Sequence, residues 1–443
     1  MDTHGWDTVC VCATDQVNVG LRQHLSGLHT GFAYSDGLVS FEGTFGPWQV
    51  VPGGSAKTVR FQTPVTSGEL VLLGQSYDLA GILPELDLQL AFVENQTASD
   101  VRDLVFDFRV SGSGPGDTTP GAVTTITPDA SGAVPSSSPA WGALHDLLPQ
   151  LLIANQEKLA YVFASVNLVP PGAASWLAPK AFDYVYVQPV AGGSGYLAVL
   201  AVVTPRDTSA LPRVVDTSLL DGAHALYFLI SPGLFLANVV LPTLPAAYGH
   251  GAALGSFAVQ DAAVRNTGPL DCGSFREGLI DYYPHLDSLS ISVDGNQLRS
   301  SASGAFDITG LTEANVTFSL GATNTCTYDP SGRTLSFAAD PDPRHDYQVN
   351  IPDWERWIGA IGGPVVLGVV YGVTTAVTSS VADSVSSSLG AGADLSIASA
   401  APVAVAWPGL SAFDVQDAGL ADGFYLRGAF ATSVPAPPHH SHW

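Results

Sequence analysis

The sequence predicts an α+β protein of two elongated modules, each a strongly curved antiparallel β-sheet wrapped around a long helix. One observation is an uncharged apolar segment from Trp357 to Ala382, and another is a long series of strand-like runs in which polar and apolar residues alternate. A third is that both halves of the chain repeat one order: strand, short helix, strand series, long helix, strands. We place the modules at 1–215 and 216–443.

The second module is organised around a long helix, expected at about residues 353–390. Pro364 suits the first turn of a helix. Residues four positions apart form a stripe along nearly one face of a helix, and the stripe rotates around the helix axis by about 40° with each step of four. Apolar residues beside these positions widen this apolar stripe. A helix that is apolar on so many sides must be buried. The residues of this stripe are Val365, Val369, Val373, Val377, Val381 and Val385.

A membrane-spanning helix is the competing interpretation of the same segment, because about 20 apolar residues suffice to cross a bilayer. Thr374 and Thr375, with the serines that follow, make its second half less hydrophobic. Arg356 stands alone before it, and no basic cluster follows that would set an orientation. We therefore favour a helix enclosed by protein and do not expect an integral membrane protein.

The first module shows the same combination of half-buried strands and one apolar helix. Leu86–Val93 and Val101–Val110 alternate polar with apolar residues, as antiparallel strands with one buried face do. Two stretches rich in Gly, Pro and Ser, Ser111–Pro120 and Asp129–Pro139, are expected to be loops. The helix that follows contains Pro149, expected to kink it. Its apolar face comprises Trp141, Leu144, Leu148, Leu151 and Leu152.

The charge balance excludes two classes of partner. The chain has 40 acidic and 16 basic residues, a net charge of −24, and only the lysines Lys57, Lys158 and Lys180. Such a surface repels nucleic acid and anionic membranes. Met1–Asp7 is polar and is not a basic segment leading into an apolar run, so we expect cytoplasmic synthesis without a secretory signal. Release by another route stays open.

Motifs for catalysis or cofactor binding are missing from the sequence. It contains no G-x-S-x-G element, no H-E-x-x-H, no P-loop and no dinucleotide-binding glycine motif. We therefore expect neither an enzyme nor a cofactor. The cysteines form neither a disulfide framework nor a zinc site, so all four are expected to be buried thiols: Cys10, Cys12, Cys272 and Cys326.

Two clusters resemble metal sites only loosely. Asp340, Asp342 and Asp346 lie beside His345 as in a calcium loop, but the prolines between them disturb the spacing and the glycine and closing glutamate are missing. A solvated turn is the expectation there. Histidines near the C-terminus could bind metal adventitiously, but we expect a disordered end. No metal site is predicted.

Short motifs near both ends carry a family resemblance. The start Thr3-His4-Gly5-Trp6-Asp7 and the stretch Trp48–Ser55 resemble the T-x-G-W-D and W-x-I-x-x-G-G-S regions of the forty-seven-kilodalton accessory proteins encoded beside botulinum-type neurotoxin genes. Tyr77–Gly81, Tyr161–Ala164 and Trp407-Pro408 are also similar to segments of that family. The resemblance is sharpest over the first hundred and the last forty residues.

That family is similar to the tubular lipid-binding (TULIP) proteins, in which curved sheets wrap long helices and leave an apolar groove. The resemblance therefore implies binding of lipid or another hydrophobic ligand, and a role beside a protein toxin or its accessory proteins. It transfers no catalytic residues. Because lysine is so scarce here, recognition of a headgroup by basic residues is in doubt.

Two functional hypotheses follow. The first is a non-enzymatic carrier of a hydrophobic ligand, since both helices have more apolar surface than one sheet contact requires. The second is a structural or assembly protein that binds other proteins and holds no ligand. The residues that the first hypothesis directs toward a groove are Leu144, Leu148, Leu151, Val365, Val369, Val373 and Val377.

Overall fold

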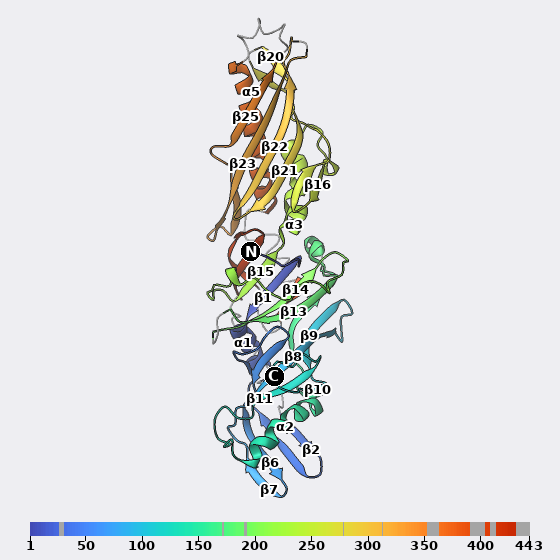
Figure 1. The fold of residues 1–443 in the computed structure, drawn as a ribbon, viewed down its shortest axis with the longest axis vertical. Helices are drawn as coiled ribbons and strands as arrows, with labels where there is room; N and C mark the ends of the chain where they lie inside the picture. Colours follow the sequence, from blue (N-terminus) through green and yellow to red (C-terminus); the bar gives the residue numbers. More distant parts are fainter. Residues whose placement is uncertain are drawn as a thin grey trace, which may run out of the picture. The chain divides into compact units, whose positions relative to one another are not determined.

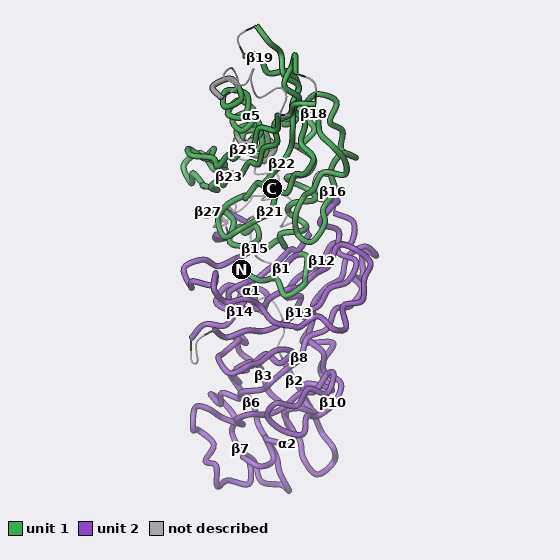
Figure 2. The backbone as a smooth tube through the Cα atoms, turned by 45° about the horizontal axis from the view of Figure 1, so that its top comes forward, with its two compact units in different colours: residues 1–7, 229–399, 415–426 green, residues 8–228, 400–414, 427–443 purple. Residues whose placement is uncertain are grey.

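The computed structural model describes nine segments of the chain: residues 1–25, 31–170, 172–189, 193–277, 279–311, 313–351, 363–389, 404–407 and 413–430. The chain folds into two compact units (Figure 2). Unit 1 comprises Met1–Asp7, Leu229–Ser399 and Val415–Leu426, and unit 2 comprises Thr8–Phe228, Ala400–Asp414 and Arg427–Trp443. The long stretch of unit 2 ends at Phe228 and unit 1 resumes at Leu229, within β15 (Leu226–Ile230). The sequence suggested a boundary at 215/216. A division into two continuous stretches does not describe these units, because both chain ends contribute to them.

Unit 2 contains several sheets whose strands pair mostly in the antiparallel direction. In one of them β1 (Thr8–Ala13) and β13 (Ala181–Val187) lie on either side of β14 (Tyr196–Val202), and all seven residues of β14 are buried. A four-stranded sheet has the order β2 (Gly31–Ser35), β3 (Val39–Phe45), β6 (Val65–Leu72), β7 (Gln75–Asp78). The remaining strands form a third sheet: β4 (Gln49–Val50), β5 (Thr58–Gln62), β8 (Glu85–Glu94), β9 (Val101–Asp107), β10 (Val110–Ser111), β11 (Ala122–Thr127), β12 (Val162–Asn167) and β26 (Val405–Ala406).

Two helices cover these sheets. Helix α1 (Thr14–Leu25) follows β1 directly. Helix α2 (Pro139–Ala154) begins with Pro139 at its first position, and Ser138 Oγ accepts a hydrogen bond from the backbone N of Ala140 at 3.2 Å. It packs against β11, β10, β2 and β6. Beneath β5 and β9 lies an aromatic core whose rings contact one another edge to face: Trp48, Phe61, Phe106 and Phe163.

Unit 1 is dominated by one large antiparallel sheet (Figure 1). Its path is β16 (Phe257–Gln260), β17 (Ala263–Asn266), β21 (His285–Asp294), β22 (Gln297–Asp307), β23 (Asn315–Asp329) and β24 (Thr334–Ala338), with β18 (Leu270–Asp271) on β21 and β25 (Arg344–Asn350) on β23. Strand β27 (Phe413–Leu420) returns near the C-terminus, and β28 (Phe424–Phe430) lies partly in each unit.

The register of β21 shifts between Leu286 and Ser288, at a bulge opposite Gly304. A Cβ at Gly304 would lie 2.0 Å from the carbonyl oxygen of His285, so only glycine permits this approach. The bulge and Gly304 together permit the curvature that the sequence predicts for this sheet.

Strands β22 and β23 alternate buried and solvent-facing residues along their length. The buried face includes Leu298, Phe306, Val316 and Leu320. Helix α5 (Gly363–Leu389) packs against β24, β23 and β25, and Ser386 Oγ accepts a hydrogen bond from the backbone N of Phe337 at 2.9 Å. The predicted helix at 353–390 is thereby confirmed from residue 363 to residue 389; positions 353–362 and 390 lie outside the described residues.

The valine stripe of α5 is buried, but the helix is not buried on all sides. Val369, Val373 and Val377 are at most 7% exposed. Leu367 and Tyr371 are 44% and 58% exposed, so the expectation of a helix enclosed all round is wrong for this face. The four-residue spacing drifts slowly enough to keep the valines against protein, whereas the i+2 positions point away. In outline, the fold is mostly β with curled sheets.

Candidate functional site

A pocket of about 130 Å³ lies in unit 1 between α5, α4 (Leu244–Tyr248) and the segment that links β18 to β19 (Phe275–Glu277). Polar and apolar groups contribute about equally to its wall. Its lining residues are Ala247, Tyr248, His250, Cys272, Phe275, Val373, Ala376, Val377 and Ser380.

Helix α5 contributes one face to the pocket. Val373, Ala376, Val377 and Ser380 follow the spacing of i, i+3, i+4 and i+7, which places all four side chains on the same side of a helix. The two valines are nearly inaccessible to solvent, whereas Ala376 is exposed. The pocket therefore opens from the buried valine stripe toward the surface of the helix.

The opposite wall is built by two tight backbone turns. After Tyr248, the helix α4 ends in three successive residues with positive φ: Gly249 at 59°, His250 at 44° and Gly251 at 85°. The His250 ring then lies against Gly273, where an added Cβ would come within 2.3 Å of its Cε1 atom. Gly273 itself has a φ of 78°. Glycine is thus required at position 273 both for its backbone conformation and for the space that the imidazole occupies.

The Tyr248 side chain is 8% exposed, and its hydroxyl has no hydrogen-bond partner among the described residues. Burial raises the pKa of this phenol well above its usual range, so it remains protonated. Burial also raises the pKa of the Cys272 thiol to about 12, with a further contribution from Asp271. Both groups are neutral, and neither is a nucleophile at neutral pH.

The prediction that all four cysteines are buried holds for three of them. Cys10, Cys12 and Cys326 are buried, whereas Cys272 is half-buried. Cys272 follows a two-residue strand, and its backbone N donates to the carbonyl of Pro284 at 3.0 Å. Its side chain lines the pocket instead of entering the core of the sheet.

The residues proposed from sequence to face a ligand fall into two groups. Val373 and Val377 line the pocket, and Val369 is buried one turn earlier on α5. The side chain of Val365 lies outside the described residues. Leu144, Leu148 and Leu151 on α2 belong to unit 2 and are 0% exposed, within the packed core on β11 and β2. Both cavities that we describe lie in unit 1.

Sequence reasoning missed Tyr248, His250 and Phe275 as pocket residues. These positions are separated from Val373 by about a hundred residues or more, and no spacing rule relates them. The one local signal is the turn Gly249-His250-Gly251, which predicts a sharp change of direction directly after an apolar helix.

A second cavity, of about 370 Å³, is shallower and more open to solvent. Residues of the paired strands β23 and β25 line it: Thr317, Phe318, Ser319, Asp346, Tyr347 and Gln348. The carboxylate of Asp340 is hydrogen-bonded within the protein, because it accepts hydrogen bonds from the backbone N atoms of Thr323 and Asp342 at 2.8 and 3.0 Å. Within the described ranges, no group of three or more His, Cys, Asp or Glu residues could hold a metal ion.

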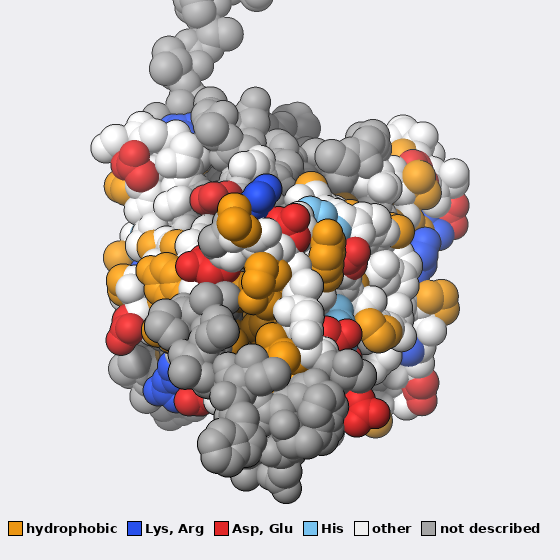
Figure 3. Space-filling view, turned by 90° about the horizontal axis from the view of Figure 1, so that it is seen from above, with side chains coloured by type: hydrophobic (Ala, Val, Ile, Leu, Met, Phe, Trp, Pro, Cys, Tyr) orange, Lys and Arg blue, Asp and Glu red, His pale blue; other side chains and the backbone are white. Residues whose placement is uncertain are grey.

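Exposed hydrophobic side chains occur on the segment that follows β19 and on α5, and we call this set the hairpin patch: Leu279, Ile280, Tyr283, Leu367 and Tyr371, between 38% and 89% exposed. Strands β19 and β20 (Ile280–Tyr282) form the hairpin, which lies on α5 where two glycines of the helix permit close approach. Figure 3 shows hydrophobic side chains gathered on one face, with acidic side chains among them.

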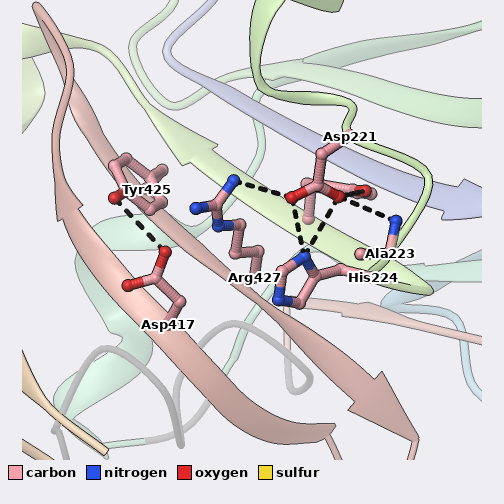
Figure 4. Close-up of polar contacts among 7 residues, drawn as sticks. Asp221, Ala223, His224, Asp417, Tyr425 and Arg427 are labelled. Carbon is pink, nitrogen blue, oxygen red and sulfur yellow. Dashed lines mark hydrogen bonds and ion pairs between the residues drawn. The ribbon is translucent and has the colours of Figure 1, made fainter.

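A polar cluster in unit 2 centres on Asp221 (Figure 4). Its carboxylate accepts hydrogen bonds from Tyr227 Oη at 2.8 Å, the backbone N of Ala223 at 2.9 Å and Arg427 Nη1 at 3.0 Å. His224 Nδ1 lies 3.0 Å from Asp221 Oδ2. The carboxylate is thus hydrogen-bonded within the protein, which indicates a structural role for the cluster.

Helix α5 is also the one helix among the described residues with the length and hydropathy to cross a membrane, over Val366–Ser387. About half of that stretch (47%) is buried within the protein. The core helix of a non-membrane protein meets the same criteria, so this property does not separate the two interpretations.

Comparison with known proteins places the chain in a family. A curated relative, "Protein P47" of Clostridium botulinum strain Kyoto / Type A2, is 28% identical over 359 residues, covering 79% of this chain and 84% of the relative. "Protein OrfX3" of Paraclostridium bifermentans is 24% identical over 268 residues, covering 55% and 54% of the two chains.

Solved structures agree with these relatives. The structure of P47 from Clostridium botulinum A2 matches with a TM-score of 0.76 and 26% identity, covering 97% of this chain and 98% of that one. P47 of Clostridium botulinum E1 has the same fold, with a TM-score of 0.76, 24% identity and coverage of 96% and 99%.

The family model described as "Protein OrfX2/OrfX3/P47" matches residues 3–421. This range contains the Thr3–Asp7 start and the Trp48–Ser55 stretch on which the predicted resemblance depended. The match confirms that resemblance, and the chain belongs to the OrfX-like family of OrfX2, OrfX3 and P47 proteins.

Proposed function

We propose that this protein is a non-enzymatic, hydrophobic-ligand-binding member of the OrfX-like family, with the wrapped-helix architecture of TULIP proteins. The observation that carries the proposal is the pocket on α5, which includes Val373 and Val377, two of the residues that the sequence directed toward a ligand. In this proposal each unit provides a sheet and a helix, and α5 supplies the apolar floor for the ligand.

The energetic support comes from the wall of the pocket. Ala376 and Phe275 present apolar surface that a ligand would remove from water, at about 25 cal/mol per Å². An engineered cavity of about 150 Å³ with apolar walls takes up benzene, so a pocket of similar size can hold an apolar group. We further propose that the protein acts beside a toxin or its accessory proteins and is released with them.

Lipid mass spectrometry of an organic-solvent extract tests this function directly. We expect the purified protein to carry a hydrophobic ligand or to take one up on incubation with a lipid mixture. Protein that is clean after purification and takes up nothing would contradict the proposal.

A pocket-filling variant gives the experiment a matched control. Ala376 is exposed and lines the pocket, so Ala376→Phe places a ring in the ligand's volume without cutting into the core. Thr375 is exposed on α5 and does not line the pocket, so Thr375→Phe adds the same ring elsewhere. We expect Ala376→Phe to lose ligand uptake and Thr375→Phe to retain it.

The second candidate function is an assembly protein that binds other proteins and holds no ligand. The hairpin patch favours it, because an aliphatic and aromatic cluster that remains exposed is typical of a protein interface. The proposed partners are toxin-cluster proteins, including relatives of the OrfX and P47 type.

Mutation of the patch separates the two functions. Tyr283→Ser and Leu279→Ser change exposed side chains and should leave the fold and ligand uptake intact. If the assembly function is correct, these variants lose association with purified cluster proteins in analytical ultracentrifugation. Unchanged association, or its absence in the unmutated protein, would remove the support for the second function.

A further inference from the structure

The cavity on β23 and β25 lies on the side of the large sheet that faces away from α5. His345 of β25 contacts Tyr371 of α5, with ring centroids 6.2 Å apart. Because side chains alternate along a strand, the next residue, Asp346, points to the other face of the sheet. The volume of this cavity, about 370 Å³, falls within the range of about 300–1,000 Å³ usual for small-molecule sites. A ligand there would be independent of the pocket on α5.

Four polar side chains surround this cavity in a regular arrangement. Thr317 lies directly opposite Gln348, and Ser319 lies directly opposite Asp346. Opposite Cβ atoms in an antiparallel pair are about 5 Å apart, and positions two apart in one strand are about 7 Å apart. The two pairs therefore mark the corners of a rectangle whose floor is the backbone between them. All four residues are exposed, so a ligand can reach them.

The chemistry of these groups combines hydrogen-bond donors with acceptors. The Asp346 carboxylate only accepts, the Gln348 amide does both, and the two hydroxyls can do either. A cationic ligand offers donors alone and would leave the amide N–H groups without acceptors. An anionic ligand would face the carboxylate, and no Lys or Arg is among the described residues that line the cavity. Neutral hydroxyl groups, which both donate and accept, match all four side chains.

A calcium ion fits this cavity poorly. Asp346 is the one acidic residue among the described residues that line it. Calcium takes six to eight oxygen ligands, usually with several carboxylates among them. The carboxylate is thus better suited to accept hydrogen bonds from a hydroxylated ligand than to hold a metal.

The hydroxyl-bearing surface continues beyond the cavity. Ser319 lies opposite Ser303 of β22, and Ser303 lies opposite Ser288 of β21, with the two Oγ atoms 2.7 Å apart. This row of serines crosses three neighbouring strands on the same face of the sheet. A ligand longer than one sugar ring can therefore extend from the cavity along the row.

We propose that this cavity binds a neutral oligosaccharide, with Asp346 and Gln348 accepting hydrogen bonds from its hydroxyl groups and Thr317 and Ser319 completing the contacts on the neighbouring strand. The inference goes beyond the proposed function, because it requires no ligand in the pocket on α5. The net charge of −24 disfavours sialylated and sulphated glycans by repulsion. The cavity is shallow, so we expect millimolar affinity for a single site.

A glycan array provides the first test. Beads that carry many copies of the labelled protein compensate for weak binding at each site, since several sites then engage the surface together. The array presents neutral oligosaccharides beside sialylated and sulphated ones. We expect binding to a subset of the neutral glycans and none to the anionic glycans.

Variants of the cavity then locate the site. The affinity for the best neutral glycan is measured by saturation-transfer NMR, with thermal unfolding to show that each variant is folded. Asp346→Ala should raise the Kd at least about 10-fold, and Gln348→Ala about 3- to 10-fold. Asp346→Asn keeps an acceptor and should lose less affinity than Asp346→Ala, whereas a site for a cation would lose as much with either change.

Two exposed residues of β22 that do not line the cavity give matched controls. Asp307→Ala removes a carboxylate and Ser301→Ala removes a hydroxyl from the same unit, and both variants should bind the glycan with unchanged Kd. Ala376→Phe, which fills the pocket on α5, should also leave glycan binding unchanged. This comparison separates a failure of the glycan site from a failure of the hydrophobic-ligand function.

Absence of binding to every neutral glycan on the array would overturn the inference. Binding that persists at full strength in both Asp346→Ala and Gln348→Ala would overturn the assignment of the site. Binding confined to sialylated or sulphated glycans would overturn the ligand class.

Discussion

Arg427 Nη1 donates to Asp221 Oδ2 across 3.0 Å and so joins residues 206 positions apart in the chain. Burial raises the pKa of Asp221, but hydrogen bonds from His224, Tyr227 and the backbone of Ala223 lower it by more, to about 2. Because unfolded Asp titrates near 3.9, the unfolded state binds more protons between these values. The stability from this carboxylate is therefore present above about pH 4 and lost as the pH falls toward 2.

Asp221→Asn should remove this part of the pH dependence. We expect the variant to lose about 1 kcal/mol at pH 7, a modest cost because the Asp221 side chain is 35% exposed. Thermal unfolding measured from pH 7 to pH 2 should show a shallower decline between pH 4 and 2 in the variant. Parallel curves for the two proteins would show that Asp221 makes no such contribution.

Val373→Asp tests whether α5 is the core of unit 1. Val373 is 0% exposed, so the change buries an unpaired carboxylate and should cost more than about 3 kcal/mol. Ser387 is exposed on the same helix, and Ser387→Asp should cost less than about 0.5 kcal/mol. Thermal unfolding compares the two variants, and ligand uptake should fall together with stability in Val373→Asp. Unchanged melting would show that α5 is not a core helix.

Two glycines of α5 should respond differently to alanine. A Cβ at Gly368 would lie 3.0 Å from Glu277 Oε2, the flexible end of a side chain that can move. Gly368→Ala should therefore stabilise the protein by up to about 1 kcal/mol through helix propensity. At Gly372 the Cβ would lie 3.0 Å from the Phe275 ring, so steric cost should cancel that gain. Chemical denaturation measures both, and equal stabilisation would contradict the close packing of Phe275.

The side chain of Asn18 hydrogen-bonds to the backbone of β4, as a neighbouring strand would. Its Nδ2 donates to the carbonyl of Val50 at 3.0 Å, and its Oδ1 accepts from the backbone N of Val50 at 2.6 Å. Asn18→Leu should leave two buried backbone groups unpaired and cost about 2–4 kcal/mol. Hydrogen exchange at the Val50 amide, read by mass spectrometry, should rise in the variant. Protection that stays unchanged would mean that another group satisfies Val50.

The sequence predicted those features that depend on local periodicity. The alternation in β22 and β23 specifies which residues are buried, because side chains along a strand point to opposite faces. The four-residue valine spacing likewise predicted which residues of α5 contact protein. The start Thr3–Asp7 carried the family resemblance, since short motifs remain recognisable when overall identity is low.

Contacts between distant segments were beyond such reasoning. The apolar character of Leu367 and Tyr371 does not distinguish them from the buried valines, and the position of the sheet leaves them exposed. Periodicity also does not predict that Tyr248 and Cys272 line the same pocket as Val373. Their position depends on two turns with positive φ and on the path of the β18–β19 connection.

Local sequence therefore determined the elements and their buried faces, through backbone periodicity and apolar pattern. The tertiary structure decided which residues line the pocket. Long-range packing is a property of the whole chain, and the free energy that positions Tyr248 beside α5 comes from many contacts distributed along it.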